Sequence, residues 1–418
     1  MSDDAVHFSP AEPPLTPIHR QPGFLSFLLS RLAAVFAMQI QAIVVAWQVY
    51  DITRDPMSLA YVGLAQFLPM FLLLLPAGDV VDRFSRKRIL QLSWSVQGIC
   101  SALLLALATA RHESVVEFYL VLALFGCARA FTGPTLQSLL PNIVPRAQLA
   151  QAIAINSAIM KVAVIGGPLL GGVLYGVGGG RLAYAVCLGC FVGALLLLLL
   201  VPVRRAEKSV LEGTAWQRFS AGIRYIRHQP IILGAISLDL FAVLLGGVVA
   251  LLPIYAQEVL QVGPEGLGAL RSAIAVGALM MGLYLGVWGI KRRAGHVMFA
   301  AVAVFGIANL VFALSTLFWV SMVAMLVAGA ADMISVYVRT TLIQLATPDA
   351  MRGRVNAVNM LFIGSSNELG EFRAGGMAAG VGVVPAAVIG GVGTLAVVGV
   401  WMRLFPTLRR VDRFDEAR

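Results

Sequence analysis

Twelve stretches of about twenty mainly apolar residues follow one another along the chain, and this pattern constrains the fold more than any other feature. A helix needs about 20 apolar residues to cross the hydrocarbon core of a bilayer, where its backbone polar groups must be satisfied internally. The sequence therefore predicts an all-α integral membrane protein with twelve transmembrane helices. The predicted spans are 24–50, 57–78, 88–110, 115–140, 147–176, 181–203, 231–257, 265–290, 296–314, 317–343, 352–379 and 384–406.

The composition agrees with a chain that lies mostly in lipid. Of its 418 residues 59% are hydrophobic and 12% are charged, whereas soluble domains carry about 25% charged residues. The net charge of +10 does not indicate a nucleic-acid partner, because membrane proteins concentrate Lys and Arg in their cytoplasmic loops. We expect the lipid bilayer, and no nucleic acid, as a partner.

The distribution of cations between the predicted loops orients the bundle. With the N-terminus placed inside, the inner loops and tails hold 21 Lys and Arg residues and the outer loops hold 3. Cytoplasmic loops carry the excess of Lys and Arg. Both termini are therefore predicted to be cytoplasmic.

The longest inner loop divides the chain into two halves. We predict a disordered cytoplasmic tail over 1–22, six-helix bundles over 23–203 and 231–406, a linker over 204–230 and a second cytoplasmic tail over 407–418.

The linker has a helical pattern of its own. Trp216, Phe219, Ile223 and Ile226 recur at helical spacing, with arginines between them. This pattern is typical of a basic amphipathic helix on a membrane surface. A solvated linker with some helix is the alternative.

The two halves also share an internal repeat. A shift of 203 residues places the segment Pro145–Asn156 on Pro348–Asn359, with Pro, Ala and Asn residues coinciding, and places Arg129 on Asp332. Two related six-helix halves indicate a transporter whose substrate site lies between them, near the middle of the bilayer.

A charged run separates the second and third apolar stretches. It reads Gly-Asp-Val-Val-Asp-Arg-Phe-Ser-Arg-Lys-Arg over 78–88. The run resembles the loop 2–3 motif of the major facilitator superfamily, Gly-x-Leu-Ala-Asp-Arg-x-Gly-Arg-Lys/Arg-x, through Gly78, Asp82, Arg83, Arg86 and Lys87. The resemblance implies a conformational lock, in which the acid contacts the eleventh helix in the outward-facing state. The second half has no equivalent acid.

Two further motifs resemble the same superfamily. Arg129-Ala-Phe-Thr-Gly133 is similar to its Arg-x-x-x-Gly motif, whose arginine is linked to proton coupling. The run Gly-Pro-Leu-Leu-Gly-Gly over 167–172 is similar to the signature of its exporters. This second resemblance implies a hinge in the fifth helix, formed by Gly167, Pro168, Gly171 and Gly172.

Shorter segments resemble one bacterial branch of the superfamily. Trp47-Gln-Val-Tyr-Asp-Ile-Thr53, Leu64-Ala-Gln-Phe-Leu-Pro69 and Ala350-Met-Arg-Gly-Arg354 are similar to the branch that contains an enterobactin exporter and related drug exporters. The resemblance implies a bacterial inner-membrane protein that exports a siderophore-like or drug-like small molecule. Transporters of this superfamily need no bound cofactor.

Several charges lie inside the predicted spans. A charge at the bilayer centre costs about 2.5–3.5 kcal/mol on insertion scales, so such residues usually face a cavity. Equivalent positions of the two halves carry opposite signs, since Arg31 corresponds to Asp239 and Arg129 to Asp332. We expect some of these charges to interact across the cavity and to carry protons; static ion pairs are the alternative. The candidates for proton coupling are Arg31, Arg129, Asp239, Asp332, Glu368 and Glu371.

Polar side chains suggest where a substrate binds. On the span 352–379, Asn356, Asn359, Asn367 and Glu371 share one helical face, which is expected to line either the cavity or the interface with the 78–88 loop. Amide and aromatic groups suit amphiphilic organic substrates, although Trp47 also fits an interfacial anchor. The candidate cavity residues are Gln39, Gln41, Trp47, Gln66, Asn156 and Asn367.

These observations favour a proton-coupled exporter of a small organic molecule that works by alternating access, as a monomer. An importer, a lipid flippase or a non-transporting membrane sensor on the same fold is the alternative. The five histidines are scattered over the tail and loops, so no catalytic constellation, metal site or enzymatic activity is predicted.

Overall fold

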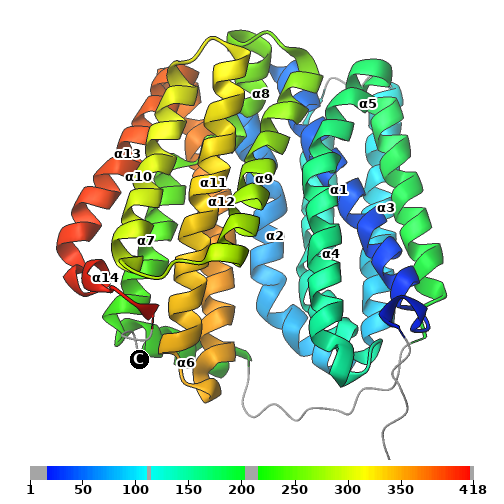
Figure 1. Cartoon of the computed structure of the whole chain (residues 1–418). Helices are drawn as coiled ribbons and strands as arrows, with labels where there is room; N and C mark the ends of the chain where they lie inside the picture. The colour runs from blue at the N-terminus through cyan, green and yellow to red at the C-terminus, as the bar shows by residue number, and fades with distance from the viewer. Residues whose placement is uncertain (1–16, 111–113, 203–214, 415–418) are drawn as a thin grey trace, which may run out of the picture.

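The computed structural model describes residues 17–110, 114–202 and 215–414, and these residues form helices and no strand. Two helical bundles stand side by side, one from each half of the chain (Figure 1). The N-terminal half contains α1 (Phe24–Thr53), α2 (Pro56–Arg83), α3 (Arg86–Ala110), α4 (Val116–Leu139) and α5 (Leu149–Leu199). The C-terminal half contains α7 (Pro230–Gly246), α8 (Leu252–Ile254), α9 (Gly263–Trp288), α10 (Ala294–Leu314), α11 (Phe318–Ala346), α12 (Asp349–Val381), α13 (Val383–Leu404) and α14 (Pro406–Arg410).

The prediction of twelve spans in two bundles is confirmed. Ten helices of the described residues are long and apolar enough to cross a membrane. One of them, α5, holds two spans, because Gly179 at φ 62° and ψ −166° interrupts its helical backbone. The remaining span is α12, which is long enough to cross a membrane but carries more charged residues than the other spans.

The outer surface of the bundle is apolar. Leu72, Leu92 and Leu120 are 63%, 68% and 66% exposed, and Trp319 is 76% exposed. Contiguous exposure of such side chains is unfavourable in water and favourable against lipid. This surface therefore fits a bilayer as its solvent.

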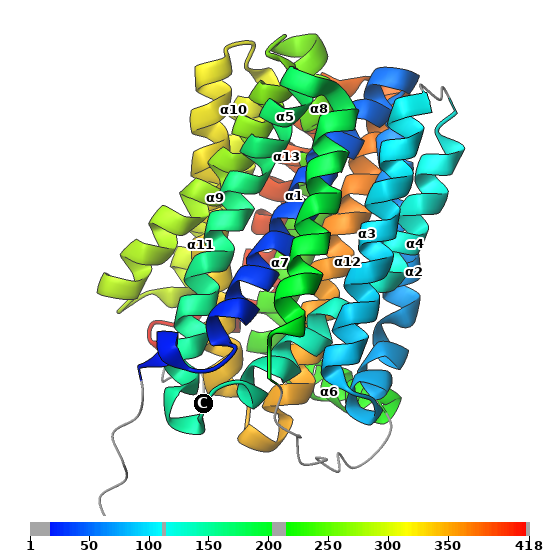
Figure 2. The ribbon, with the colours of Figure 1, turned by 90° about the vertical axis from the view of Figure 1, so that its right-hand side faces the viewer.

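Both described ends of the chain lie at the same end of the bundle, together with α6 (Ala215–Arg227) (Figures 1 and 2). We call this the basic end, and the other the opposite end. The prediction of a disordered tail through residue 22 extends too far, since Ile18–Arg20 form a 3-10 turn. Burial of Ile18 in the core of the N-terminal half, at 5% exposure, holds this turn in place. Residues 1–16 lie outside the described part of the chain.

The linker helix α6 packs against the C-terminal half. Ile226 is buried in a cluster with side chains of α7, α11 and α12, and Phe219 and Ile223 pack on that cluster. Tyr225 Oη donates a hydrogen bond to the carbonyl of Ala346 (3.0 Å). A Cβ at Gly222 would lie 2.7 Å from the carbonyl oxygen of Arg354. The apolar side chains of α6 from Phe219 to Ile226 are therefore covered by protein, whereas Trp216 is 64% exposed. Residues 203–214 lie outside the described structure.

The predicted span 231–257 is not one continuous helix, which corrects the sequence prediction. The helix α7 ends at Gly246, and after Gly247 in extended conformation the chain continues as a 3-10 turn, the short α8 and a π-helix over Tyr255–Val259. Asn309 Nδ2 donates to the freed carbonyl of Gly246 (3.0 Å). Irregular backbone at membrane depth needs such partners.

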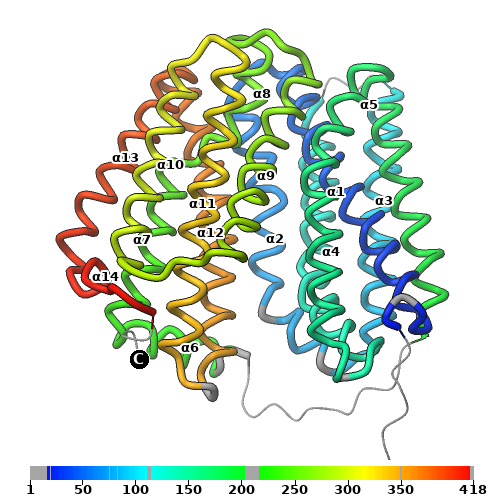
Figure 3. The backbone as a smooth tube through the Cα atoms, viewed as in Figure 1, coloured from blue at the N-terminus to red at the C-terminus, as the bar shows by residue number. Residues whose placement is uncertain are grey.

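The two halves are in close contact at the opposite end. There, α5 packs on α9 and α2 packs on α12 (Figure 3). Glycine makes the first contact possible, because a Cβ at Gly172 would lie 2.3 Å from the carbonyl oxygen of Pro264. Tyr50 Oη donates to Glu258, and Trp47 is buried in an apolar cluster drawn from both halves. We call this set of contacts the opposite-end seal.

Candidate functional site

A cavity of about 200 Å³ lies between the two halves. Its walls come from α1, α2 and α4 of the N-terminal half, and from α9, α12 and the irregular segment after α7 in the C-terminal half. The break in α7 exposes Val249, Ala250 and Pro253 to this space. Binding sites for drug-sized molecules usually span 300–1,000 Å³, so a substrate of that size needs the cavity to widen or to join a neighbouring space.

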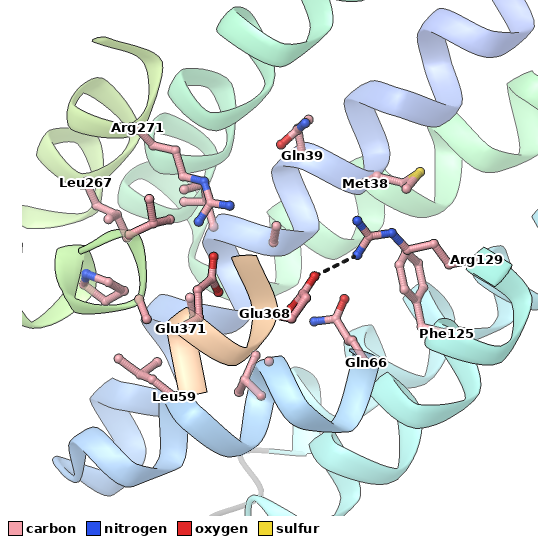
Figure 4. Close-up of a pocket in the computed structure, with 18 residues that line it drawn as sticks. Met38, Gln39, Leu59, Gln66, Phe125, Arg129, Leu267, Arg271, Glu368 and Glu371 are labelled. Atoms are coloured by element: carbon pink, nitrogen blue, oxygen red, sulfur yellow. Dashed lines mark ion pairs between the residues drawn. The ribbon is translucent and has the colours of Figure 1, made fainter. Parts of the chain in front are cut away.

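Two cations and two acids line the cavity. Arg129 Nη1 on α4 lies 3.8 Å from Glu368 Oε1 on α12, with side-chain exposures of 38% and 18%. Arg271 on α9 and Glu371 on α12 lie on the other side of the same space and point toward one another (Figure 4). The Arg129–Glu368 pair joins the two halves of the molecule. Any motion that separates the halves around the cavity must therefore break this pair.

Three of these charges were predicted from the sequence, and Arg271 was missed. The sequence did contain a signal for Arg271, because it is a lone cation in the apolar stretch of α9. The structure brings it into the wall opposite Arg129. The cavity charges are thereby balanced, and each carboxylate has a cation near it.

The proposed carriers Asp239 and Asp332 lie elsewhere, on α7 and α11 of the C-terminal half. Asp239 on α7 forms an ion pair with Arg339 on α11, with side-chain exposures of 7% and 2%. Asp332 on α11 is close enough to Asp239 and Arg339, and to Lys161 on α5 of the N-terminal half, to interact with them electrostatically. None of these side chains lines the central cavity.

The charges that correspond through the repeat have other partners in this structure. Arg31 Nη1 donates to Asn156 Oδ1 (2.8 Å), within the N-terminal half. Asp239 pairs with Arg339 and Arg129 with Glu368. Of the two cations among these four charges, Arg129 thus does interact across the cavity, with an acid on α12 as its partner.

Of the predicted substrate residues, Gln39 and Gln66 line the cavity. Gln41 is buried and accepts a hydrogen bond from Ser101 Oγ (2.8 Å). Trp47 packs against Tyr175, with ring centroids 6.3 Å apart, in the opposite-end seal. Asn367 is exposed and lies outside the cavity wall, as does Asn156, which binds Arg31.

Two cations of the predicted lock contact their own half here. Arg86 Nη1 donates to the carbonyl of Ser138 (3.1 Å), and Lys87 Nζ donates to that of Val201 (2.7 Å). A Cβ at Gly78 would meet nothing within 4 Å. Arg83 ends α2 and is exposed, and the side chain of Asp82 lies outside the described part of the structure.

The predicted hinge is a region of close helix packing. A Cβ at Gly167 would lie 2.5 Å from Gln39 Cβ, and one at Gly171 would lie 3.1 Å from Ile40 Cα. On the other side of α5, Gly268 approaches the carbonyl of Pro168 in the same way, at 2.5 Å. This run thus sits between α1 and α9, and bending at Pro168 stays a prediction.

Comparison with known proteins places the whole chain in one family. Residues 12–417 match the family described as transmembrane secretion effector. The enterobactin exporter EntS of Citrobacter koseri is 27% identical over 400 residues, covering 95% of each chain. EntS of Salmonella typhimurium is 26% identical over 410 residues, covering 96% of each.

Solved structures share the fold. A bacterial homologue of the iron transporter ferroportin, in an inward-facing state, superposes with a TM-score of 0.71 at 18% identity, covering 94% of this chain and 100% of that one. The nucleoside transporter NupG gives 0.71 at 12% identity, covering 92% and 100%. These likenesses and the sequence relatives agree with the twelve-helix architecture. The chain belongs to the transmembrane secretion effector family of the major facilitator superfamily of membrane transporters.

Proposed function

We propose that this chain exports a siderophore-like small organic molecule from the bacterial cytoplasm in exchange for protons. The enterobactin exporters to which it is similar over 95% of its length support the direction and the substrate class. The excess of cations at the basic end supports a cytoplasmic position for that end and for both termini. A substrate cavity complete within one chain supports a monomer.

The observation that carries proton coupling is the Arg129–Glu368 ion pair across the cavity. With the opposite end closed, the pair holds an ionised carboxylate beside its cation. Rocking of the two halves about the cavity separates the two side chains. A carboxylate left without its cation in a low-dielectric site favours the protonated form. Return of the halves restores the pair and releases the proton toward the basic end.

Glu371 and Arg271 extend this arrangement. Because both line the same cavity, Arg271 is available to hold Glu371 while Arg129 holds Glu368. An incoming anionic or polar group of the substrate would compete for these cations. In this proposal Asp239 and Asp332 support the C-terminal half, and the two glutamates carry the proton.

Transport into vesicles tests the proposal. The full-length protein is reconstituted into liposomes that are acidic inside, and uptake of iron-free enterobactin is measured. We expect uptake that an uncoupler abolishes, and at least a tenfold loss in Glu368→Gln and in Glu371→Gln, within the contribution typical of a proton-transferring group. Asp412→Asn, which changes a partly exposed acid outside the cavity and near the C-terminus, serves as the matched control. Full gradient-dependent uptake in both glutamine variants would refute proton transfer at these positions.

A further inference from the structure

A second chamber opens from the central cavity into the N-terminal half. It has a volume of about 290 Å³ and lies among α1, α2, α3 and α4. Met38 and Arg129 line both spaces, so the two adjoin. The chamber lies on the side of the basic end, because Arg31 and Trp94 come from the third turns of helices that begin there. We call it the side chamber.

The side chamber differs from the central cavity in its charge. Arg31 and Arg129 line it, and no acidic side chain does so among the described residues. Most of its other lining is apolar, including Met70 and Leu74. The central cavity holds two acids against two cations, whereas the side chamber has two cations and no counter-charge of its own.

Two of the residues that line this chamber each have an enclosed donor atom without an acceptor. Trp94 is 0% exposed, and its indole Nε1 has no hydrogen-bond partner. Arg31 donates from Nη1 to Asn156, yet its buried Nε is also unpartnered. Buried donors in folded proteins nearly always have a partner. A donor set of this kind, beside two cations, fits a negatively charged acceptor.

We propose that the side chamber binds an anionic group of the transported molecule, with the apolar part of that molecule against Met70 and Leu74. The inference rests on the proposed transport function. Arginine and N–H donors bind carboxylates, sulfonates and phosphates through charge-assisted hydrogen bonds. Because Arg129 borders both spaces, the bound anion draws this arginine away from Glu368. Substrate binding thereby frees the carboxylate that pairs the two halves.

A pair of fluorescent probes tests the anion site. The probes are 8-anilinonaphthalene-1-sulfonate and its uncharged parent, N-phenyl-1-naphthylamine, which share one apolar body and differ by the sulfonate. Their affinities are measured on the full-length protein in lipid nanodiscs, with empty nanodiscs subtracted. We expect Arg31→Gln to weaken binding of the sulfonate about tenfold and Trp94→Phe to weaken it about fivefold. Binding of the uncharged probe stays unchanged in both variants.

Matched controls use residues far from the chamber. Trp216→Phe changes an indole that is 64% exposed on α6, and Arg410→Gln changes an exposed arginine of α14; neither should alter the affinity for either probe. Glu368→Gln releases Arg129 from its carboxylate and should tighten binding of the sulfonate about threefold.

The outcomes separate this inference from the proposed function. Unchanged sulfonate affinity in both Arg31→Gln and Trp94→Phe overturns the anion site, even if wild-type vesicles transport enterobactin. Equal losses for the charged and uncharged probes also overturn it, because they indicate altered apolar packing. Selective loss of the sulfonate supports the site, even if enterobactin proves not to be transported.

Discussion

Two ion pairs of this molecule, one in the central cavity and one inside the C-terminal half, use the same chemistry in different surroundings. Arg129 and Glu368 are 38% and 18% exposed and belong to different halves. Arg339 and Asp239 are 2% and 7% exposed and belong to the same half. In the proposed mechanism the first pair separates when the halves move, whereas both members of the second pair belong to one half.

The difference shows why a charge inside a membrane protein need not be a proton carrier. Breaking a buried pair leaves an uncompensated charge in a medium of low dielectric, which is strongly unfavourable. A pair that faces a water-filled cavity can exchange its partner for water, a proton or a substrate. We therefore expect stability to depend on the buried pair and transport to depend on the cavity pair.

The largest expected effect comes from breaking the buried pair. Arg339→Met leaves Asp239 without its cation, and should lower the free energy of unfolding by about 3–5 kcal/mol. The double variant with Asp239→Leu removes both charges of the pair and should recover part of this loss, since Asp332 loses Arg339 and keeps Lys161. Thermal unfolding of the purified protein in detergent measures both. Wild-type stability in the single variant would show that the pair is dispensable.

The next effect concerns the opposite-end seal. In the proposed mechanism the Arg129–Glu368 pair is formed while this seal is closed. A Cβ at Gly172 would lie 2.3 Å from the carbonyl oxygen of Pro264, so Gly172→Ala forces α5 and α9 apart. Overpacking of this kind destabilises a structure by about 1–3 kcal/mol. Here it should destabilise only the state in which α5 and α9 are in contact. The cavity should become accessible from the opposite end, and the buried Asp239–Arg339 pair should be unaffected.

Labelling measures that accessibility. Leu59 lines the cavity and is 5% exposed, so Leu59→Cys is introduced after the four native cysteines are replaced by alanine. A membrane-impermeant maleimide added from the opposite end should react faster in Gly172→Ala. Gly189→Ala, on the same helix but with nothing within 4 Å of its added Cβ, is the matched control. Equal rates in the two variants would show that the Gly172 contact does not close this end.

The sequence predicted the features that depend on local segments, but not those that depend on contacts between distant helices. Span positions, the two halves and the glutamates of α12 followed from local hydropathy and from the cost of a charge in lipid. The partner of each charge did not follow, because it depends on how helices distant in sequence pack. Arg129 corresponds to Asp332 through the repeat, yet it pairs with Glu368.

The break in the seventh helix was also missed. The sequence signal was Gly246-Gly247, but glycine pairs are common in transmembrane helices that stay continuous. What stabilises the break is the Asn309 side chain, which donates to the Gly246 carbonyl from another helix. Hydropathy cannot reveal a partner of this kind.

A smaller effect is expected for stability when the cavity pair is broken. Glu368→Gln removes an ion pair with a partly exposed arginine, so solvent screening limits its contribution to less than about 1 kcal/mol. Unfolding in detergent should therefore occur within about 4 °C of wild type, although transport is lost. A shift as large as that of Arg339→Met would contradict the contrast between the two pairs.

The smallest effect is expected for a third pair, Arg292 and Asp412, which is the most exposed of the three at 73% and 35%. Asp412 accepts a hydrogen bond from the Arg293 backbone N–H (2.9 Å) and lies 3.4 Å from Arg292 Nε. The backbone hydrogen bond, with the nearby Arg292, holds the pKa of Asp412 below its ordinary value of 3.8. Its contribution is therefore present above pH 3.8 and is lost as the pH falls through the lowered value.

Asp412→Asn should thus loosen only the chain end at neutral pH. The backbone N–H groups of Ala294 and Gly295 donate to the carbonyls of Asp412 and Val411 (3.1 and 3.0 Å), and hydrogen exchange reports their protection. We expect faster exchange of these two amides, no change in global unfolding, and convergence with wild type in acid. A change in global stability would mean that the exposure of an ion pair does not determine how much the pair contributes to the stability of the fold. Unaltered exchange would mean that the backbone contacts, rather than the carboxylate, hold the chain end against α10.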